Sequence, residues 1–143
     1  MDPSEISYST DQISVAEYKA LLEDAGWPLP DDTAIIDSLN NTSFSVAARD
    51  INGDIMGYGR ITGDNSLHHY ISDVIVLRRF RKQGIGAHLM SHLMGHIQQN
   101  AKPGAFVGLF STRGHELFFA KHGFIQRPNA QNGAGMFLTV SGE

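Results

Sequence analysis

Residues 71–94, ISDVIVLRRFRKQGIGAHLMSHLM, carry the clearest structural signal in the chain. They open on an apolar run rich in β-branched residues, which is typical of a buried strand. A basic turn with two glycines follows. Apolar residues then recur at helical spacing on one face, at Ile85, Leu89, Leu93 and Ile97. The segment therefore predicts a strand, a glycine-bearing loop and a helix in direct succession.

This succession suits a bound phosphate group. The first turn of a helix has backbone N–H groups without partners, and the helix dipole places partial positive charge there. Glycines let a ligand come close to the backbone, and such turns bind phosphate or pyrophosphate, although an ordinary tight turn has the same pattern. Two common nucleotide-binding loops are excluded. The dinucleotide fingerprint needs a third glycine where Leu89 stands, and the Gly-Lys-Ser/Thr of a Walker loop is absent.

The remaining motif is Arg81-Lys82-Gln83-Gly84-Ile85-Gly86. It resembles the R/Q-x-x-G-x-G/A signature of the GNAT superfamily of acyl-CoA-dependent N-acetyltransferases. A second segment, LFFAKHGF at residues 117–124, is similar to the late motif of that family. The resemblance implies that amides of the loop hold the pyrophosphate of coenzyme A. It also implies that the strand before the loop pairs with the pantetheine arm.

Composition narrows the class of protein. With 143 residues, we expect residues 1–143 to form a single N-acetyltransferase (GNAT) domain. The lack of cysteine excludes disulfides, thiolate metal sites and cysteine nucleophiles. A net charge of −4 argues against a nucleic-acid partner. No run is long enough to predict a membrane span and no signal segment is recognisable, so we expect a cytoplasmic protein without a membrane partner.

Turn signals and hydrophobic periodicity predict an α+β domain. The predicted strands cover residues 5–10, 44–49, 55–62, 67–77, 106–110, 124–127 and 136–140. The predicted helices cover residues 14–26, 32–39, 85–100 and 114–122. This order matches the element order of the resembled family. The expected architecture is therefore a GNAT-like fold, with a mixed central sheet of about six to seven strands flanked by about four helices.

The resemblance implies an acetyl-CoA site that is built largely from backbone groups. The residues that match the pyrophosphate-binding turn are Arg81, Lys82, Gln83, Gly84, Ile85, Gly86 and Ala87. The residues that match the pantetheine-binding strand are Val74, Ile75 and Val76, one of whose N–H groups would polarise the thioester carbonyl. Thr112 falls where many family members have an Asn that contacts the pantetheine arm. Helix capping is the alternative role for Thr112.

Two residues bear on the chemistry of acyl transfer. Asp73 lies inside an apolar run, where an unpaired carboxylate is costly, so it is the candidate catalytic base or ammonium-orienting group. A structural pairing with Arg60 is the alternative. Phe119 stands where the family commonly has a Tyr that protonates the leaving thiolate, and Phe has no proton to donate. Phe119 is therefore expected at most to pack on the cofactor, with the proton coming from solvent or another residue.

The acceptor site is only weakly encoded. The candidate substrate-binding residues are Trp27, Tyr58, Arg60 and Tyr70, together with the loop at residues 129–135.

His88, His92 and His96 recur at a spacing that can hold a divalent metal. Leu89 stands where the zincin motif requires Glu, and no fourth ligand is evident, so we expect an exposed polar face and no metal.

Three functions are compatible with these patterns. The leading hypothesis is an enzyme that moves an acetyl group from acetyl-CoA to a primary amine, on a small-molecule acceptor, by direct transfer. The alternative is a non-catalytic acyl-CoA-binding or regulatory domain, which the residue at position 119 favours. A phosphate binder unrelated to acyl transfer is supported only by the basic glycine turn. Similar proteins commonly form homodimers, and the sequence leaves that state open.

Overall fold

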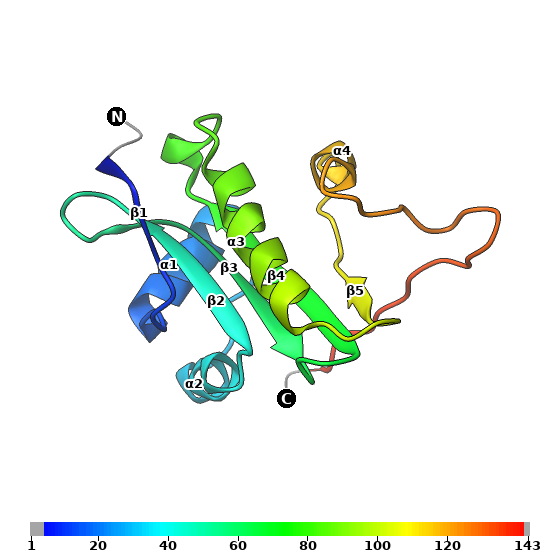
Figure 1. Cartoon of the computed structure of the whole chain (residues 1–143). Helices are drawn as coiled ribbons and strands as arrows, with labels where there is room; N and C mark the ends of the chain where they lie inside the picture. Colours follow the sequence, from blue (N-terminus) through cyan, green and yellow to red (C-terminus); the bar gives the residue numbers. More distant parts are fainter. Residues whose placement is uncertain (1–4, 142–143) are drawn as a thin grey trace. The chain divides into compact units, whose positions relative to one another are not determined.

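The computed structural model describes residues 5–141 (Figure 1). These residues form five β-strands and four α-helices, which confirms the predicted α+β class. The chain divides into two compact units, one that ends at Leu109 and one that begins at Phe110. All five strands belong to the first unit, which also holds the predicted phosphate-binding turn.

The strands form one mixed sheet in the order β1-β2-β3-β4-β5. Their bounds are β1 (Ser7–Ser9), β2 (Phe44–Arg49), β3 (Ile55–Gly63), β4 (His68–Val76) and β5 (Phe106–Gly108). Strands β1 to β4 are antiparallel to their neighbours, and β5 runs parallel to β4. A parallel pair needs a crossover connection, which the long helix between β4 and β5 provides, as the sequence predicts.

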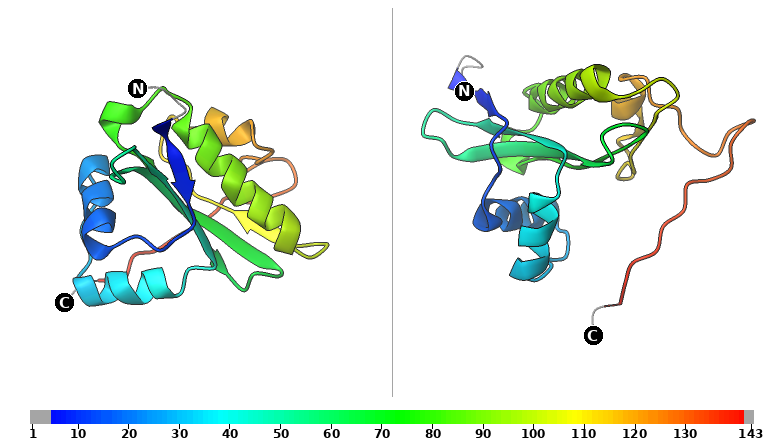
Figure 2. Two further views of the ribbon diagram at one scale, coloured as in Figure 1. Left: turned by 60° about the vertical axis from the view of Figure 1, so that its left-hand side comes forward. Right: turned by 60° about the horizontal axis from the view of Figure 1, so that its bottom comes forward.

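Three helices of the first unit cover both faces of its sheet (Figure 2). The helices of the chain are α1 (Val15–Ala25), α2 (Asp32–Asn40), α3 (Ile85–Asn100) and α4 (Glu116–Ala120). Helices α1 and α2 lie on one face and α3 on the other. Helix α1 begins at a capping box formed by Ser14 and Glu17 and ends at Gly26 in the left-handed conformation. None of the helices in residues 5–141 is long and apolar enough to cross a membrane.

The sheet is buried between two apolar layers. The core between the sheet and the helices α1 and α2 includes Tyr18, Leu21, Leu22, Ile35, Leu39, Ala47, Tyr58 and Ile75. Helix α3 buries Ile85, Leu89, Met90, Leu93 and Ile97. Two glycines of β3 allow α3 to approach closely. A Cβ at Gly59 would lie 3.0 Å from Leu93 Cδ1, and one at Gly57 would lie 3.2 Å from Leu89 Cδ1.

The two predicted closing strands are wrong. Residues 124–127 and 136–140 are irregular, so the sheet has five strands in the described part of the chain, and the expected six to seven are not found. The predicted strand at 106–110 and helix at 114–122 are also shorter, at Phe106–Gly108 and Glu116–Ala120. A strand needs a neighbour for its backbone groups, and the second unit contains none among residues 110–141.

Candidate functional site

The turn between β4 and α3 presents an open helix N-terminus. After a short 3-10 helix, η2 (Arg78–Phe80), Lys82 and Gly84 adopt left-handed backbone conformations with φ of 64° and 84°. Gly84 is the N-cap of α3 and provides no side-chain hydrogen bond, and no acidic residue occupies the first turn. The first-turn amides of this 16-residue helix are therefore free of any side-chain cap and favour a bound anion.

The turn is basic and is anchored on both sides. Its exposed cationic residues are Arg78, Arg79, Arg81 and Lys82. Arg81 Nε donates to the carbonyl of Val76 at 3.1 Å, which fixes the turn to the end of β4. The Arg78 N–H donates to Asp24 Oδ2 at 2.8 Å, which fixes it to α1. The loop can therefore keep its shape while Lys82 remains exposed for an anionic ligand.

Strand β4 has an open edge that leads into this turn. It pairs with β5 only at residues 68–70, through Phe106, Val107 and Gly108. Beyond Tyr70, β4 has no strand partner on this side among the residues that the structure describes. An extended ligand with amide groups can pair with such an edge. The edge at residues 74–76 and the anion-binding turn thus follow each other along the chain.

A β-bulge interrupts β4 at the start of this edge. The register pairs on either side of it are Tyr58 with Ile75 and Arg60 with Ser72. Asp73 and Val74 therefore oppose the single residue Gly59. Asp73 has φ of 56°, the left-handed conformation that glycine usually supplies in a bulge of this kind, at a cost of about 1 kcal/mol. A bulge bends its strand, which is consistent with β4 leaving β5 after Tyr70.

The carboxylate of Asp73 is held by two donors. Arg60 Nε lies 2.7 Å and Tyr18 Oη 2.9 Å from Asp73 Oδ2. The side chains of Arg60 and Asp73 are 8% and 13% exposed, so this ion pair is largely shielded from water. Arg60 also donates to the carbonyl and hydroxyl of Ser38 and to the hydroxyl of Thr42. The pairing considered from the sequence as the alternative to catalysis is therefore present, and Asp73 Oδ1 takes no part in it.

Three tyrosines lie close enough to this ion pair for its charges to affect their pKa. Burial, followed by the charge of Asp73, raises the pKa of Tyr18 to about 12. Burial also raises the pKa of Tyr58 and, together with Asp73, that of Tyr70. All three phenols are therefore protonated at neutral pH. Tyr58 is 1% exposed and meets the Tyr18 ring edge-on at 6.5 Å, so the structure places it in the core.

The other predicted acceptor residues are less closely grouped. Trp27 is partly buried against the core that α1 and α2 form with the sheet, and Phe80 packs against the same core. Arg60 has its guanidinium occupied by Asp73 and the end of α2. The loop at residues 129–135 belongs to the second unit, where Asn129 closes a turn through the N–H groups of residues 131 and 132. The sequence did not predict the contact of Tyr18 with Asp73.

Thr112 and Phe119 also lie in the second unit. The predicted capping role of Thr112 is wrong, because the N-cap of α4 is His115 and it makes no side-chain cap. Thr112 Oγ1 instead lies 2.8 Å from His115 Nδ1. Phe119 packs edge-on against Phe118 at 5.0 Å and Phe124 at 6.5 Å. Phe119 is thus part of a small aromatic cluster.

The histidine stripe of α3 packs against aromatic rings of the sheet edge. The Tyr8 ring lies 5.2 Å from that of His92 and 5.5 Å from that of His88. His96 stacks on Phe44 at 4.3 Å. No group of three or more His, Cys, Asp or Glu residues that could hold a metal occurs within residues 5–141.

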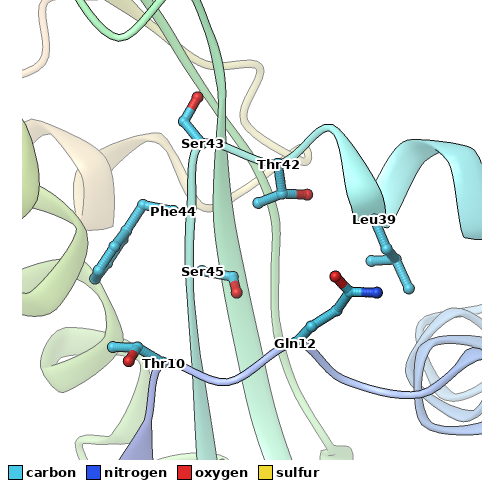
Figure 3. A pocket seen from close by; sticks show the side chains of 7 residues that line it. All are labelled: Thr10, Gln12, Leu39, Thr42, Ser43, Phe44 and Ser45. Carbon is cyan, nitrogen blue, oxygen red and sulfur yellow. The ribbon is translucent and has the colours of Figure 1, made fainter.

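Two hollows of the surface contain no residue of the turn. The first has a volume of about 290 Å³ and opens where the chain leaves β1 beside the end of α2 (Figure 3). It is lined by Thr10, Gln12, Leu39, Thr42, Ser43, Phe44 and Ser45. A second, of about 270 Å³, lies beside α3 at Phe44 and His96. Neither contains a residue predicted from the sequence to bind cofactor or acceptor, and the open β4 edge remains the better candidate.

Comparisons with known proteins agree with this geometry. The sequence model of the acetyltransferase (GNAT) family matches residues 10–124. A Pyropia yezoensis protein named uncharacterized N-acetyltransferase ycf52 is 26% identical over 128 residues, which are 87% of this chain and 72% of that protein. The chain therefore belongs to the GNAT family of acetyltransferases, whose co-substrate is acetyl-CoA.

Solved structures share the fold over nearly the whole chain. A crystal structure of a protein of unknown function from meticillin-resistant Staphylococcus aureus, described as a probable acetyltransferase, superposes with a TM-score of 0.85 at 26% identity. It covers 94% of this chain and 99% of that one. A GNAT-family acetyltransferase from Streptococcus pneumoniae has a TM-score of 0.77 at 23% identity, with 94% and 98% coverage, and shares the fold.

Proposed function

We propose that this protein transfers the acetyl group of acetyl-CoA to a primary amine of a small-molecule acceptor, by direct attack of the amine on the thioester. Residues 1–143 would act together as one N-acetyltransferase domain. The observation that carries the proposal is the continuity of the open β4 edge with the uncapped N-terminus of α3. These two features suit the two chemically different parts of coenzyme A, an amide-bearing arm and a pyrophosphate.

The residues present fit acetyl-CoA, which supplies an activated thioester when it is bound. The first-turn amides and exposed cations of the turn suit a pyrophosphate. The turn residues proposed to hold it are Arg81, Lys82, Gln83, Gly84, Ile85, Gly86 and Ala87. The backbone of residues 74–76 would pair with the pantetheine amides. For Thr112 and Phe119, contact with the cofactor stays a prediction from the family resemblance.

The chain would assist the reaction through three groups. A backbone N–H within residues 74–76 would donate to the thioester oxygen, where negative charge develops. Asp73 would orient the acceptor ammonium through Oδ1, because Oδ2 is occupied by Arg60 and Tyr18. The paired guanidinium offsets the charge of Asp73, which favours an orienting role over that of a strong base. Tyr70, Trp27 and the core residue Tyr58 would shape the acceptor side.

Phe119 stands where the family commonly has the Tyr that donates a proton to the leaving thiolate. A thiol with a pKa near that of cysteine, about 8.5, leaves as a thiolate that water can protonate near neutral pH. Turnover therefore does not require a Tyr at this position. The second candidate function, a non-catalytic acyl-CoA-binding domain, rests on this same substitution and shares the proposed binding site.

Thermal denaturation with acetyl-CoA, free coenzyme A, ATP and NAD tests the binding site. A ligand at a hundred times its Kd stabilises the folded state by about 2.7 kcal/mol, so coenzyme A and acetyl-CoA should raise Tm while ATP and NAD should not. Thiol release with a panel of small amines then tests turnover. Binding without amine-dependent thiol release would favour the non-catalytic function. No shift with either coenzyme A ligand at high concentration would overturn both.

A further inference from the structure

One buried arginine connects four elements of the first unit. Arg60 lies on β3 and is 7% exposed. Its donors reach Asp73 on β4, at 2.7 Å, and Ser38 and Thr42 at the end of α2, at 2.9–3.1 Å. Tyr18 of α1 donates to the same carboxylate oxygen as Arg60 does, and its ring lies 5.6 Å from the guanidinium carbon. The end of α2, α1 and the β4 bulge are thus joined through one guanidinium.

These contacts of Arg60 and Tyr18 with Asp73 also affect the open edge of β4. Asp73 is a residue of the bulge itself, and its left-handed backbone is a conformation that an L-residue keeps only when its surroundings hold it. The donors on Oδ2 are the contacts that hold this side chain. Val74, the second residue of the bulge, is also the first residue of the proposed pantetheine-binding edge. A displacement of Asp73 would therefore move both the edge and Asp73 Oδ1.

We propose that Arg60 and Tyr18 are positioning residues for acyl transfer, which hold Asp73 Oδ2 and thereby fix the β4 bulge in the conformation that the open edge requires. This inference rests on the proposed function. Neither residue needs to contact acceptor or cofactor. Their effect passes through Asp73 to the backbone of Val74 and to Oδ1, the oxygen proposed to orient the acceptor. Arg60 accordingly serves as an internal support and not as an anchor for a substrate carboxylate.

Two substitutions and two matched controls test the proposal. Tyr18→Phe removes one hydroxyl and keeps the ring. Arg60→Lys keeps the charge but loses the planar guanidinium, whose N–H donors reach Asp73 and the end of α2 together. Arg49→Lys is the control for Arg60, because Arg49 joins β2 to α1 through Glu17 at 2.5 Å, outside the bulge. Tyr8→Phe is the control for the loss of a tyrosine hydroxyl. For each variant, Tm, the Kd for acetyl-CoA by calorimetry, kcat and both KM values are measured.

The positioning role predicts a specific pattern. Arg60→Lys should lower kcat by about tenfold or more and weaken acetyl-CoA binding by about threefold or more, because small misplacements of oriented groups cost up to about a hundredfold. Tyr18→Phe should show the same signs with smaller changes. The controls should leave Kd and kcat within about twofold of the wild type, whatever their effect on Tm.

Either of two results overturns the inference. If Tyr18→Phe and Arg60→Lys lower Tm but leave kcat and the Kd for acetyl-CoA as in the controls, the contacts of Arg60 and Tyr18 with Asp73 serve stability alone. If the wild-type chain itself fails to bind acetyl-CoA, the proposed function fails and this inference falls with it. The wild-type measurement therefore distinguishes failure of the proposed function from failure of the positioning role alone.

Discussion

The substitution Gly84→Ala separates the stability of the turn before α3 from its proposed affinity for coenzyme A. Gly84 has φ of 84°, and a Cβ built on it meets no heavy atom within 4 Å. Steric overlap therefore adds nothing, and the cost is that of placing an L-residue in the left-handed conformation. That cost is about 1 kcal/mol, which lowers Tm by about 4 °C in a chain of this length.

Gly104→Ala provides a control with the same backbone cost. Gly104 has φ of 86° and equally open space, and it follows the opposite end of α3. A helix of 16 residues spans about 24 Å, so this position is remote from the turn. Both variants should lose similar stability in urea or thermal unfolding. Gly84→Ala alone should weaken acetyl-CoA binding in calorimetry, by about tenfold, because a shift at the N-cap redirects the first-turn amides.

Two results would refute this reasoning. An unchanged Kd for acetyl-CoA in Gly84→Ala, together with the expected loss of stability, would mean that the first-turn amides do not hold the pyrophosphate. Equal weakening of binding by Gly104→Ala would mean that binding responds to overall stability. Either outcome would remove the support that the uncapped N-terminus of α3 gives to the proposed function.

Three further predictions concern the core, the chemistry and the pH dependence. Gly59→Ala should lower the free energy of unfolding in urea by about 1–3 kcal/mol, because its Cβ would lie 3.0 Å from Leu93 Cδ1. The additional substitution Leu93→Val should restore part of that stability, and unchanged stability in Gly59→Ala would contradict the close packing. Asp73→Asn, which tolerates the left-handed backbone, should lower kcat about tenfold, and undiminished kcat would exclude an orienting role. Its amide oxygen can still accept from Arg60 and Tyr18, so the Kd for acetyl-CoA should change less than in Arg60→Lys. Burial, and to a smaller extent the nearby His69, lower the pKa of His96 in the folded chain, so the unfolded chain binds more protons as pH falls. Tm should therefore fall as pH drops below about 6.5, and His96→Gln should make Tm less dependent on pH in that range.

Much of the first unit could be predicted from local sequence signals. The capping box at Ser14, the glycine that ends α1, the turn at residues 51–53 and the apolar stripe of α3 each act within a few residues. Their physical causes are hydrogen bonds and backbone preferences that need no distant partner. The same holds for the anion-binding turn, since its glycine and its basic residues are contiguous in the chain.

The two closing strands show where local propensity fails. Residues 136–140 have the composition of a strand, but Met136, Phe137, Leu138 and Val140 are 80–86% exposed and unpaired. Pairing depends on a neighbouring edge that no local pattern supplies. The capping role considered for Thr112 fails for a different, local reason. The imidazole of His115 is close enough to compete for its hydroxyl.

By itself, the sequence determined the family, the order of the elements in the first unit and the place of the glycine turn before α3, because these depend on contiguous residues. Only the tertiary structure decided which groups the Asp73 carboxylate contacts. An acidic residue in an apolar run indicates that a partner or a purpose exists, but not which one. Folding brings Arg60 from β3 and Tyr18 from α1 to one oxygen of that carboxylate and places a bulge beneath it. These contacts span 13 and 55 residues of chain, a separation over which only the packed sheet and helix bring the groups together.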